Sequence, residues 1–107
     1  MGLGAAINGL RPIIEIMYAD FCLVAADQLF NQIAKVRHMF GGDSPVPLIV
    51  RIRAAGGHGY GSQHSMDPSG LFALWPGWRV ICPTTPFDYI GLFNSAVMCD
   101  DPVVIVE

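Results

Sequence analysis

The stretch VPLIVRI, residues 46–52, decides the fold class of this 107-residue chain. It is apolar and rich in β-branched residues, with little alternation of polar and apolar positions, which is typical of a strand buried on both faces. Three further runs have the same character: PIIEIMY at 12–18, WRVICP at 78–83 and PVVIVE at 102–107. The four runs predict the strands of a parallel sheet, because such strands need helices on both sides.

Helical patterns separate these strands. We expect helices over 3–10, ending at Gly9, over 21–40, ending at Gly41-Gly42, and over 69–75, where Asp67-Pro68 offers a cap and a first-turn proline. A capping box, in which Thr85 caps and Asp88 reaches back, begins a last helix that runs to about Cys99. The core-facing positions predicted for the 21–40 helix are Leu23, Ala26, Phe30, Ile33 and Ala34.

Strands that alternate with helices predict the α/β class, as a three-layer α/β/α open parallel sheet. The length suits one domain, residues 1–107. In such sheets, ligands bind beyond the carboxyl ends of the strands.

The composition is apolar for a single domain. Hydrophobic residues make up 52% of the chain and charged residues 14%, against about a quarter charged in typical domains. No run of about 18 apolar residues lacks a charge or turn signal, which argues against a membrane-spanning helix. The composition therefore predicts extensive contacts with partner chains, or a piece of a larger protein. No signal peptide is visible at the N-terminus.

The charges and cysteines exclude other classes. The net charge is −3 with only six Lys+Arg, so nucleic-acid binding is not expected. Cys22, Cys82 and Cys99 lie far apart without a CxxC pair, which predicts free, buried thiols in a reducing compartment.

The segment AAGGHGYGSQHSMDPSG, residues 54–70, follows the strand at 46–52 and is the candidate site. It lacks the lysine of a phosphate-binding P-loop, and its glycines do not match dinucleotide-binding spacing. Its two histidines, His58 and His64, are six apart, which is not a zinc spacing, so we predict no metal site. Gly57, Gly59 and Gly61 at alternate positions predict a close approach of backbone or ligand.

No nucleophile is indicated in this segment either. Ser65 neighbours His64, but there is no GxSxG elbow. What remains is the polar triplet Gln63-His64-Ser65 at a strand's carboxyl end, with an imidazole that can donate, accept or carry a proton. From these residues alone, a surface histidine in a loop stays an open alternative.

Several motifs together resemble a known family. GLGAAINGLRPIIEIMYADF, AADQLFNQIAK, the GG turn, VPLIVRIR, the QHS triplet, PGWRVICP and DDPVVIVE run in order over the whole chain. They resemble the beta chain of the decarboxylating component of 2-oxoacid dehydrogenase complexes, of the pyruvate, branched-chain and acetoin types. The resemblance implies an oxidoreductase subunit with a transketolase-like, pyrimidine-binding domain for thiamine diphosphate. The implied reaction is oxidative decarboxylation with acyl transfer to a lipoyl carrier.

The resemblance also implies roles for three residues. Phe21 matches an aromatic residue that packs on the pyrimidine ring of the cofactor, with simple core packing as the alternative. Met17 matches a second apolar neighbour of that ring. His64 matches the active-site histidine, which bonds the substrate carboxylate or the acyl intermediate and assists transfer to the lipoyl arm.

The implied partners are an alpha chain in a heterotetramer, a lipoyl-bearing acyltransferase and a small 2-oxoacid. The alpha chain is expected to hold the diphosphate and its Mg²⁺. No membrane partner is expected, and the exposed apolar surface predicts self-association. The expected location is the cytoplasm, or the mitochondrial matrix in a eukaryote.

Departures from the family pattern predict an incomplete domain that is inactive as an isolated chain. The family's activating glutamate lies upstream of the part that Met1 matches, and Glu15 does not replace it, because it lies inside a strand. The family's C-terminal domain is absent after Glu107. Arg53-Ala54-Ala55 replaces a Pro-x-Gly, and Cys99 stands where members that bind a monovalent cation often have an acid. A transketolase-like carbon–carbon transferase and a non-catalytic interaction module remain alternatives.

Overall fold

A computed structural model describes all residues from 1 to 107. The strands are β1 (Ile13–Ile16), β2 (Ile49–Ile52), β3 (Arg79–Ile81) and β4 (Val103–Val106). The α-helices are α1 (Gly2–Ile7), α2 (Ala34–Met39), α3 (Ser69–Ala73) and α4 (Pro86–Met98). A 3₁₀ helix, η1 (Ala19–Leu23), and a π-helix, η2 (Asp27–Ile33), precede α2. No helix combines the length and apolar character needed to cross a bilayer.

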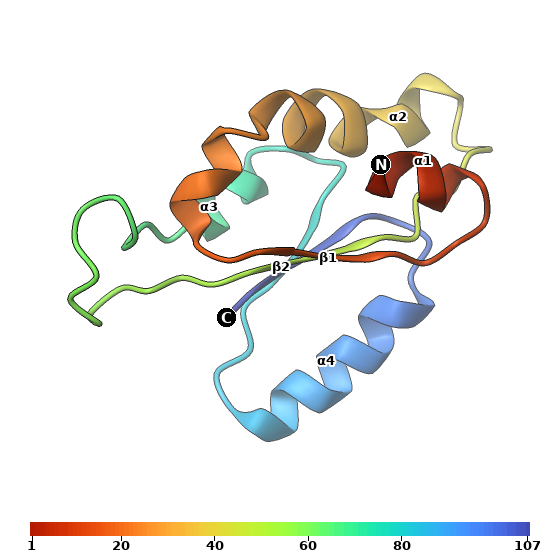
Figure 1. Ribbon diagram of the computed structural model, residues 1–107. Coiled ribbons are helices and arrows are strands. Elements are labelled where there is room, and N and C mark those ends of the chain that lie inside the picture. Colours follow the sequence, from red (N-terminus) through yellow and green to blue (C-terminus); the bar gives the residue numbers. More distant parts are fainter.

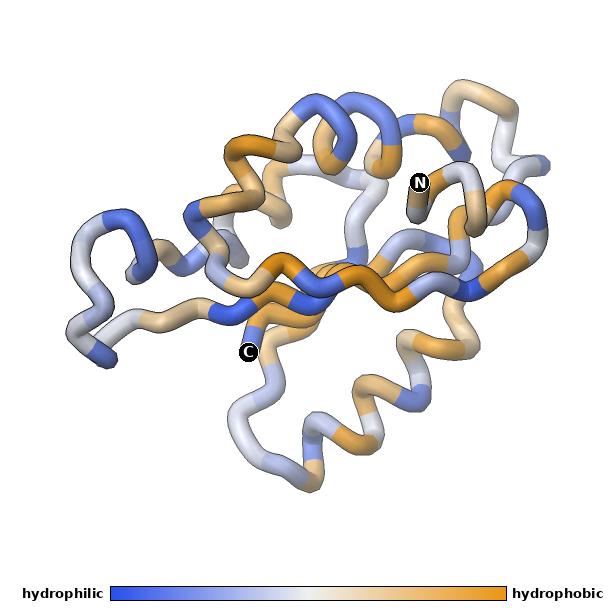
Figure 2. Tube along the Cα trace, viewed as in Figure 1, coloured by the Kyte–Doolittle hydropathy of each residue, from blue (hydrophilic) through white to orange (hydrophobic).

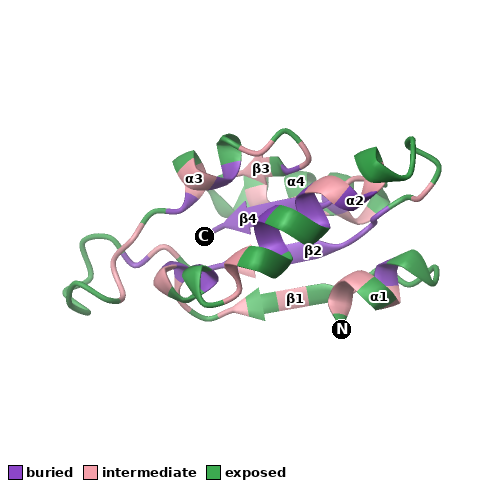
Figure 3. Ribbon diagram, turned by 90° about the horizontal axis from the view of Figure 1, so that it is seen from above, coloured by how far each residue is buried: buried purple, intermediate pink, exposed green.

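The four strands form one sheet in the order β1-β2-β4-β3, and every pairing is parallel. All four residues of β4 are buried, whereas residues of the edge strand β1 alternate between exposed and half-buried (Figure 3). The predicted parallel sheet is confirmed. Its apolar strands lie in the middle of the molecule (Figure 2).

Helices cover both faces of the sheet, but unequally. The helices α1, α2 and α3 lie on one side, and α4 lies alone on the other (Figure 1). The first side contains a cluster of 16 buried apolar residues. The α4 side contains only four: Ile49, Ala96, Val103 and Ile105. The three-layer prediction is therefore confirmed, with one thin layer.

The predicted helix ends at glycine are confirmed for two helices. After α1, Gly9 N donates to Ala6 O and Leu10 N to Ala5 O, with φ +90° at Gly9. After α2, Gly41 N and Gly42 N make the corresponding bonds to His38 O and Arg37 O. Both are Schellman motifs, which satisfy the last carbonyls of a helix and need a left-handed residue.

The helix predicted over 21–40 differs in its first half. The chain begins winding at Ala19 as a 3₁₀ helix, and regular α-helix starts only at Ala34. Phe30, Ile33 and Ala34 are buried as predicted, but Leu23 is 57% exposed. That prediction was wrong because the tighter 3₁₀ winding turns Leu23 out of the apolar stripe formed by the turns that follow.

Side chains close both ends of α4. Thr85 Oγ1 accepts a bond from Asp88 N (3.1 Å), as a capping residue should, and its hydroxyl donates to the Asp88 carboxylate (2.7 Å). Asp88 thus bonds the Thr85 hydroxyl instead of the backbone N–H expected of a capping box. At the other end the Arg11 guanidinium donates to Val97 O and Cys99 O, each at 2.8 Å. A cation at a helix C-terminus satisfies free carbonyls and opposes the helix dipole.

The cap of α3 is shifted by one residue from the prediction. Asp67 Oδ1 accepts the Ser69 N–H (2.8 Å), but Pro68 occupies the cap position instead of the first helical position. The turn between α3 and β3 then packs closely on the helices before it. A Cβ on Gly77 would lie 1.7 Å from Ala34 O, and Trp78 Nε1 donates to Leu29 O (3.1 Å). Only glycine allows this approach.

We expect Gly77→Ala to lower the free energy of unfolding by about 2–3 kcal/mol, because the added methyl group must displace helix backbone. Gly70→Ala in α3 is the matched control, since its Cβ would meet no atom within 4 Å. The control should be neutral or stabilising by up to about 1 kcal/mol. Urea unfolding followed by circular dichroism measures the stability of both variants. Equal unfolding midpoints for the two would contradict the close contact of Gly77 with Ala34.

Candidate functional site

The parallel pairing of β1 and β2 brings two chain segments together at one edge of the sheet. Ile16, the last residue of β1, is the register partner of Ile52, the last residue of β2. Beyond them, Ala19 N donates to Arg53 O (2.9 Å). The 3₁₀ helix η1 and the glycine-rich segment therefore leave the sheet side by side, and the segment extends beyond this edge (Figure 1).

His64 lies among aromatic rings at this edge. Its ring centroid is 4.7 Å from that of Tyr18 and 5.3 Å from that of Phe21, both edge-on. Tyr60 lies edge-on to Tyr18 at 5.6 Å. We call Tyr18, Phe21, Tyr60 and His64 the aromatic cluster. Two of the residues singled out from the sequence, Phe21 and His64, thus come into contact.

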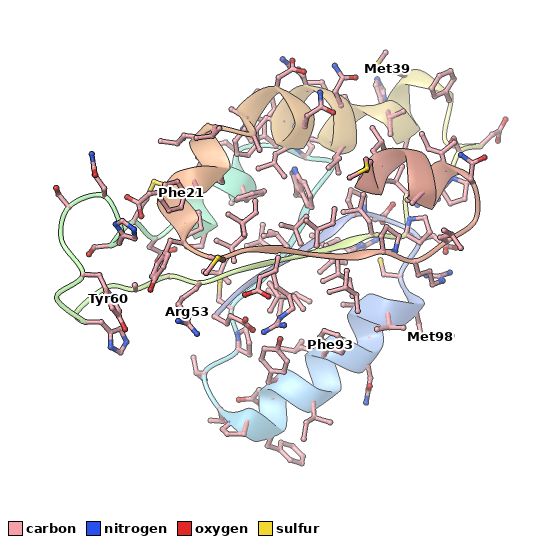
Figure 4. The ribbon with its side chains drawn as sticks, viewed as in Figure 1. Phe21, Met39, Arg53, Tyr60, Phe93 and Met98 are labelled. Atoms are coloured by element: carbon pink, nitrogen blue, oxygen red, sulfur yellow. The ribbon has the colours of Figure 1, made fainter.

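Phe21 is a surface residue of the cluster. Its side chain projects from η1 (Figure 4) and the residue is 46% exposed, whereas its neighbour Cys22 is fully buried. Simple core packing, the alternative for Phe21, therefore does not describe it. Met17 is 68% exposed and belongs to neither apolar cluster. In the sequence it follows β1 and directly precedes Tyr18 of the aromatic cluster.

The glycines of the segment have a conformational role. Gly57, Gly59 and Gly61 adopt φ of +81°, +74° and +92°, which L side chains rarely adopt. A Cβ on any of them would meet no atom within 4 Å. The expected close approach is therefore not present within the chain, and the backbone turn itself requires glycine.

Hydrogen bonds hold the QHS triplet in place. His64 N and Ser65 Oγ both donate to Gly61 O, at 3.2 and 2.7 Å. Met66 N donates to Asp20 Oδ2 (3.2 Å), which joins the segment to η1. Asp20, like Tyr18 and Tyr60, was missed by the sequence analysis. The position of Tyr18 and Asp20 directly after a parallel strand is the signal that could have found them.

Hydrogen bonding, burial and charge shift the pKa of three groups near this edge. The backbone N–H of Ser69 lowers the pKa of Asp67. Partial removal of the Cys82 thiol from water, and then the Asp67 charge, raises the pKa of this thiol, which follows β3 and belongs to an exposed residue. Burial, with a smaller effect of Asp20, raises the pKa of Cys22. All three cysteines are free. Cys22 is buried as predicted, Cys99 is only half-buried, and the prediction was wrong for Cys82, which is exposed. It lies just past the end of the short strand β3.

A sizeable hollow lies elsewhere in the chain. It has a volume of about 920 Å³ and is formed by the ends of α2 and the turns before β3 and β4. Arg37 and Arg79 in its wall both pair with Asp101. Both guanidinium groups are therefore already paired within the chain. The strands begin at this hollow, whereas ligands of such sheets bind beyond the carboxyl ends of the strands, so we place the candidate site at the opposite end of the sheet. No three His, Cys, Asp or Glu side chains gather as metal ligands anywhere in the chain.

An open parallel sheet with an imidazole and exposed aromatic rings at its carboxyl edge defines a ligand-binding domain of the α/β class. Residues 1–107 match the family model described as the transketolase pyrimidine binding domain, and the chain belongs to that family.

Curated relatives are beta subunits of larger enzymes. The chain is 45% identical over 105 residues to the acetoin:2,6-dichlorophenolindophenol oxidoreductase subunit beta of Cupriavidus necator, covering 98% of this chain and 31% of that one. It is 38% identical over 107 residues to the 2-oxoisovalerate dehydrogenase subunit beta of Bacillus subtilis (100% and 33%). It is 41% identical to the mitochondrial pyruvate dehydrogenase E1 component subunit beta of Caenorhabditis elegans (100% and 30%). The chain spans about a third of the length of these relatives.

Among solved structures, a split gene transketolase, described as an inactive beta4 tetramer, has the same fold. Its TM-score is 0.77 at 19% identity, covering 98% of this chain and 31% of that one. The resemblance of this chain to the transketolase-like pyrimidine-binding domain is thus confirmed.

We expect a maleimide to label Cys82 in the folded chain while Cys22 stays unlabelled, because Cys82 is exposed and Cys22 is buried. Asp67→Asn should speed the labelling of Cys82, since removing the carboxylate charge lowers the pKa of that thiol. Mass spectrometry of timed samples measures both rates, and urea provides the fully labelled control. Equal rates for Cys22 and Cys82 under native conditions would contradict this burial.

Proposed function

We propose that this chain forms the pyrimidine side of a thiamine diphosphate site in the beta chain of a 2-oxoacid dehydrogenase. The reaction proposed for the assembled enzyme is oxidative decarboxylation of a small 2-oxoacid with acyl transfer to a lipoyl carrier. The observation that carries the proposal is the contact of Phe21 and His64 at the carboxyl edge, at 5.3 Å. It occurs in a chain that aligns over 98% or more of its length with beta subunits of this kind.

The side chains at this edge fit the ring end of the cofactor. Phe21 offers a partly exposed aromatic face, and aromatic pairs in offset or edge-on geometry are favourable. Met17, exposed next to the end of β1, would be a second apolar neighbour. We assign the diphosphate and Mg²⁺ to the alpha chain. Thiamine diphosphate, when bound, supplies the carbon nucleophile and the electron sink for decarboxylation.

His64 is the residue we propose to meet the substrate. Its ring lies edge-on to those of Tyr18 and Phe21, and we propose that its ring nitrogens bond a ligand. An imidazole near neutral pH can donate to a carboxylate or to the acyl group and can move a proton. We assign to it the hydrogen bond to the substrate carboxylate or acyl intermediate, and assistance in transfer to the lipoyl arm.

Two alternatives remain for the activity. The shared fold with a split gene transketolase supports a carbon–carbon transferase, but at 19% identity it supports the fold alone. The beta-subunit relatives, at 38–45% identity, favour the dehydrogenase. A non-catalytic interaction module is the second alternative, and cofactor binding would exclude it.

The outer face of α4 supports partner binding. Phe87, Ile90 and Met98 are exposed on this helix, and Asp88 is its only charged residue (Figure 4 shows Met98). We propose that this face packs on a second copy of the chain and that an alpha chain completes a heterotetramer. The lipoyl-bearing acyltransferase is the further partner. We propose the cytoplasm, or the mitochondrial matrix in a eukaryote, as its location.

The extent of the domain is part of the proposal. We propose that residues 1–107 form part of a larger pyrimidine-binding domain, which the coverage of about a third of each relative supports. The isolated chain is expected to lack decarboxylase activity.

We expect thiamine diphosphate to bind the chain only when its alpha chain is present, because the two chains hold different ends of the cofactor. Phe21→Ala should weaken binding about tenfold through the lost ring contact. Phe40→Ala, an exposed aromatic residue remote from the cluster, is the control. Calorimetric titration with thiamine diphosphate measures the affinity of the wild type and of both variants. Tight binding without the alpha chain, or an unchanged affinity in Phe21→Ala, would overturn the proposal.

Self-association through α4 is testable separately. Sedimentation should show dimers or larger species of the isolated chain, because α4 leaves apolar side chains uncovered. Ile90→Lys should shift the distribution towards monomer. Leu74→Lys places the same charge on an exposed leucine of the opposite layer and should leave the distribution unchanged. A monomeric wild-type chain at high concentration would contradict this interface.

A further inference from the structure

We propose that Asp20 is a positioning residue that fastens the His64 segment to the helix carrying Phe21. This inference deepens the proposed function and rests on it for the role of His64. It starts from one contact between segments that are 46 residues apart: the Met66 N–H donates to Asp20 Oδ2 at 3.2 Å. Asp20 directly precedes Phe21, and Met66 follows His64 by two residues.

The segment makes few other hydrogen bonds to the rest of the chain, and its Ala54 and Met66 side chains pack against the larger apolar cluster. Ala54 N donates to Glu107 O at its start. The bonds made by His58 N, His64 N and Ser65 Oγ all end on carbonyls within the segment itself. The Asp20–Met66 bond is therefore the hydrogen bond that fixes the second half of the segment against η1.

The glycines make this tie necessary. The segment can adopt many backbone conformations because it contains Gly56, Gly57, Gly59 and Gly61. Ring contacts alone restrain the orientation of the His64 side chain only weakly. A carboxylate that accepts a backbone N–H is a charge-assisted bond and has a preferred geometry. Placed two residues from His64, it keeps the imidazole edge-on to Phe21. Asp20 acts through the backbone and does not itself need to touch cofactor or substrate.

A second acid provides a matched control. Asp27 lies in η2, is exposed, and bonds Asn31 and Gln28 on its own helix. Asp27→Ala removes the same charge without touching the His64 segment. Asp20→Asn retains an oxygen that can accept the Met66 N–H, whereas Asp20→Ala does not.

The first test is NMR of the full chain without cofactor. In the wild type, Tyr18 and Phe21 should shift the ring protons of His64 away from their free-histidine positions. Asp20→Ala should return these shifts towards free histidine and speed hydrogen exchange of the Met66 amide about tenfold. Asp20→Asn and Asp27→Ala should retain both wild-type readouts. Unchanged His64 shifts and Met66 protection in Asp20→Ala would overturn the proposal.

Variants of the donor keep the test valid if Asp20→Ala does not fold. Met66→Pro removes the donated N–H and leaves Asp20 in place, whereas Met66→Ala keeps the N–H and loses only the side chain. The proline variant should lose the His64 shifts and the alanine variant should keep them. Equal shifts in the two variants would contradict the inference.

Kinetics separate this inference from the proposed function. In a full-length beta chain assembled with the alpha chain, Asp20→Ala should lower the rate of acyl transfer about tenfold while thiamine diphosphate affinity stays within about twofold, and Asp20→Asn should restore the rate. An equal loss in both variants would overturn the positioning role. If the wild type binds no thiamine diphosphate, the proposed function fails, and the NMR result still decides whether Asp20 holds the segment.

Discussion

The parallel pairing of β2 with β1 is the constraint on which the site depends. Because the two strands run in the same direction and end in register at Ile16 and Ile52, whatever follows each strand must emerge at the same edge. The bond from Ala19 N to Arg53 O continues this alignment past the sheet. Phe21 and His64, 43 positions apart in the sequence, meet because of it.

The unequal layers explain the apolar composition. One face of the sheet is packed by a cluster of 16 buried residues, but α4 covers the other with only Ala96 fully buried from its own length. The Arg11 guanidinium fixes the end of this helix by bonding Val97 O and Cys99 O. A helix that is well capped but apolar on its outer side is typical of a surface that packs on another chain. Only 24 of 107 residues are buried, which also favours such contacts.

At the candidate site, rigid and adaptable parts are combined. Phe21 projects from the short 3₁₀ helix η1. Cys22, the next residue of this helix, is buried, and this burial holds the backbone of Phe21 in place. His64 lies on a segment whose glycines adopt left-handed conformations, which allows a tight path but leaves the backbone free to move. The ring contacts and the Asp20–Met66 bond restrain it. The proposed function asks this chain for one wall of a cofactor pocket, and this arrangement suits that role.

The sequence by itself determined the strands, their parallel arrangement and the helix ends at Gly9, Gly41 and Thr85, because these follow from local signals. Continuous apolar runs such as 46–52 require burial on both faces, and Gly9, Gly41 and Thr85 have conformational preferences that neighbours do not change. The resemblance of its motifs also pointed to Phe21 and His64. Tertiary structure decided the rest. The exposure of Leu23, the bond from Asp20 to Met66 and the contacts of Tyr18 and Tyr60 with the site depend on the path of a glycine-rich segment between distant elements, and no local preference specifies that path.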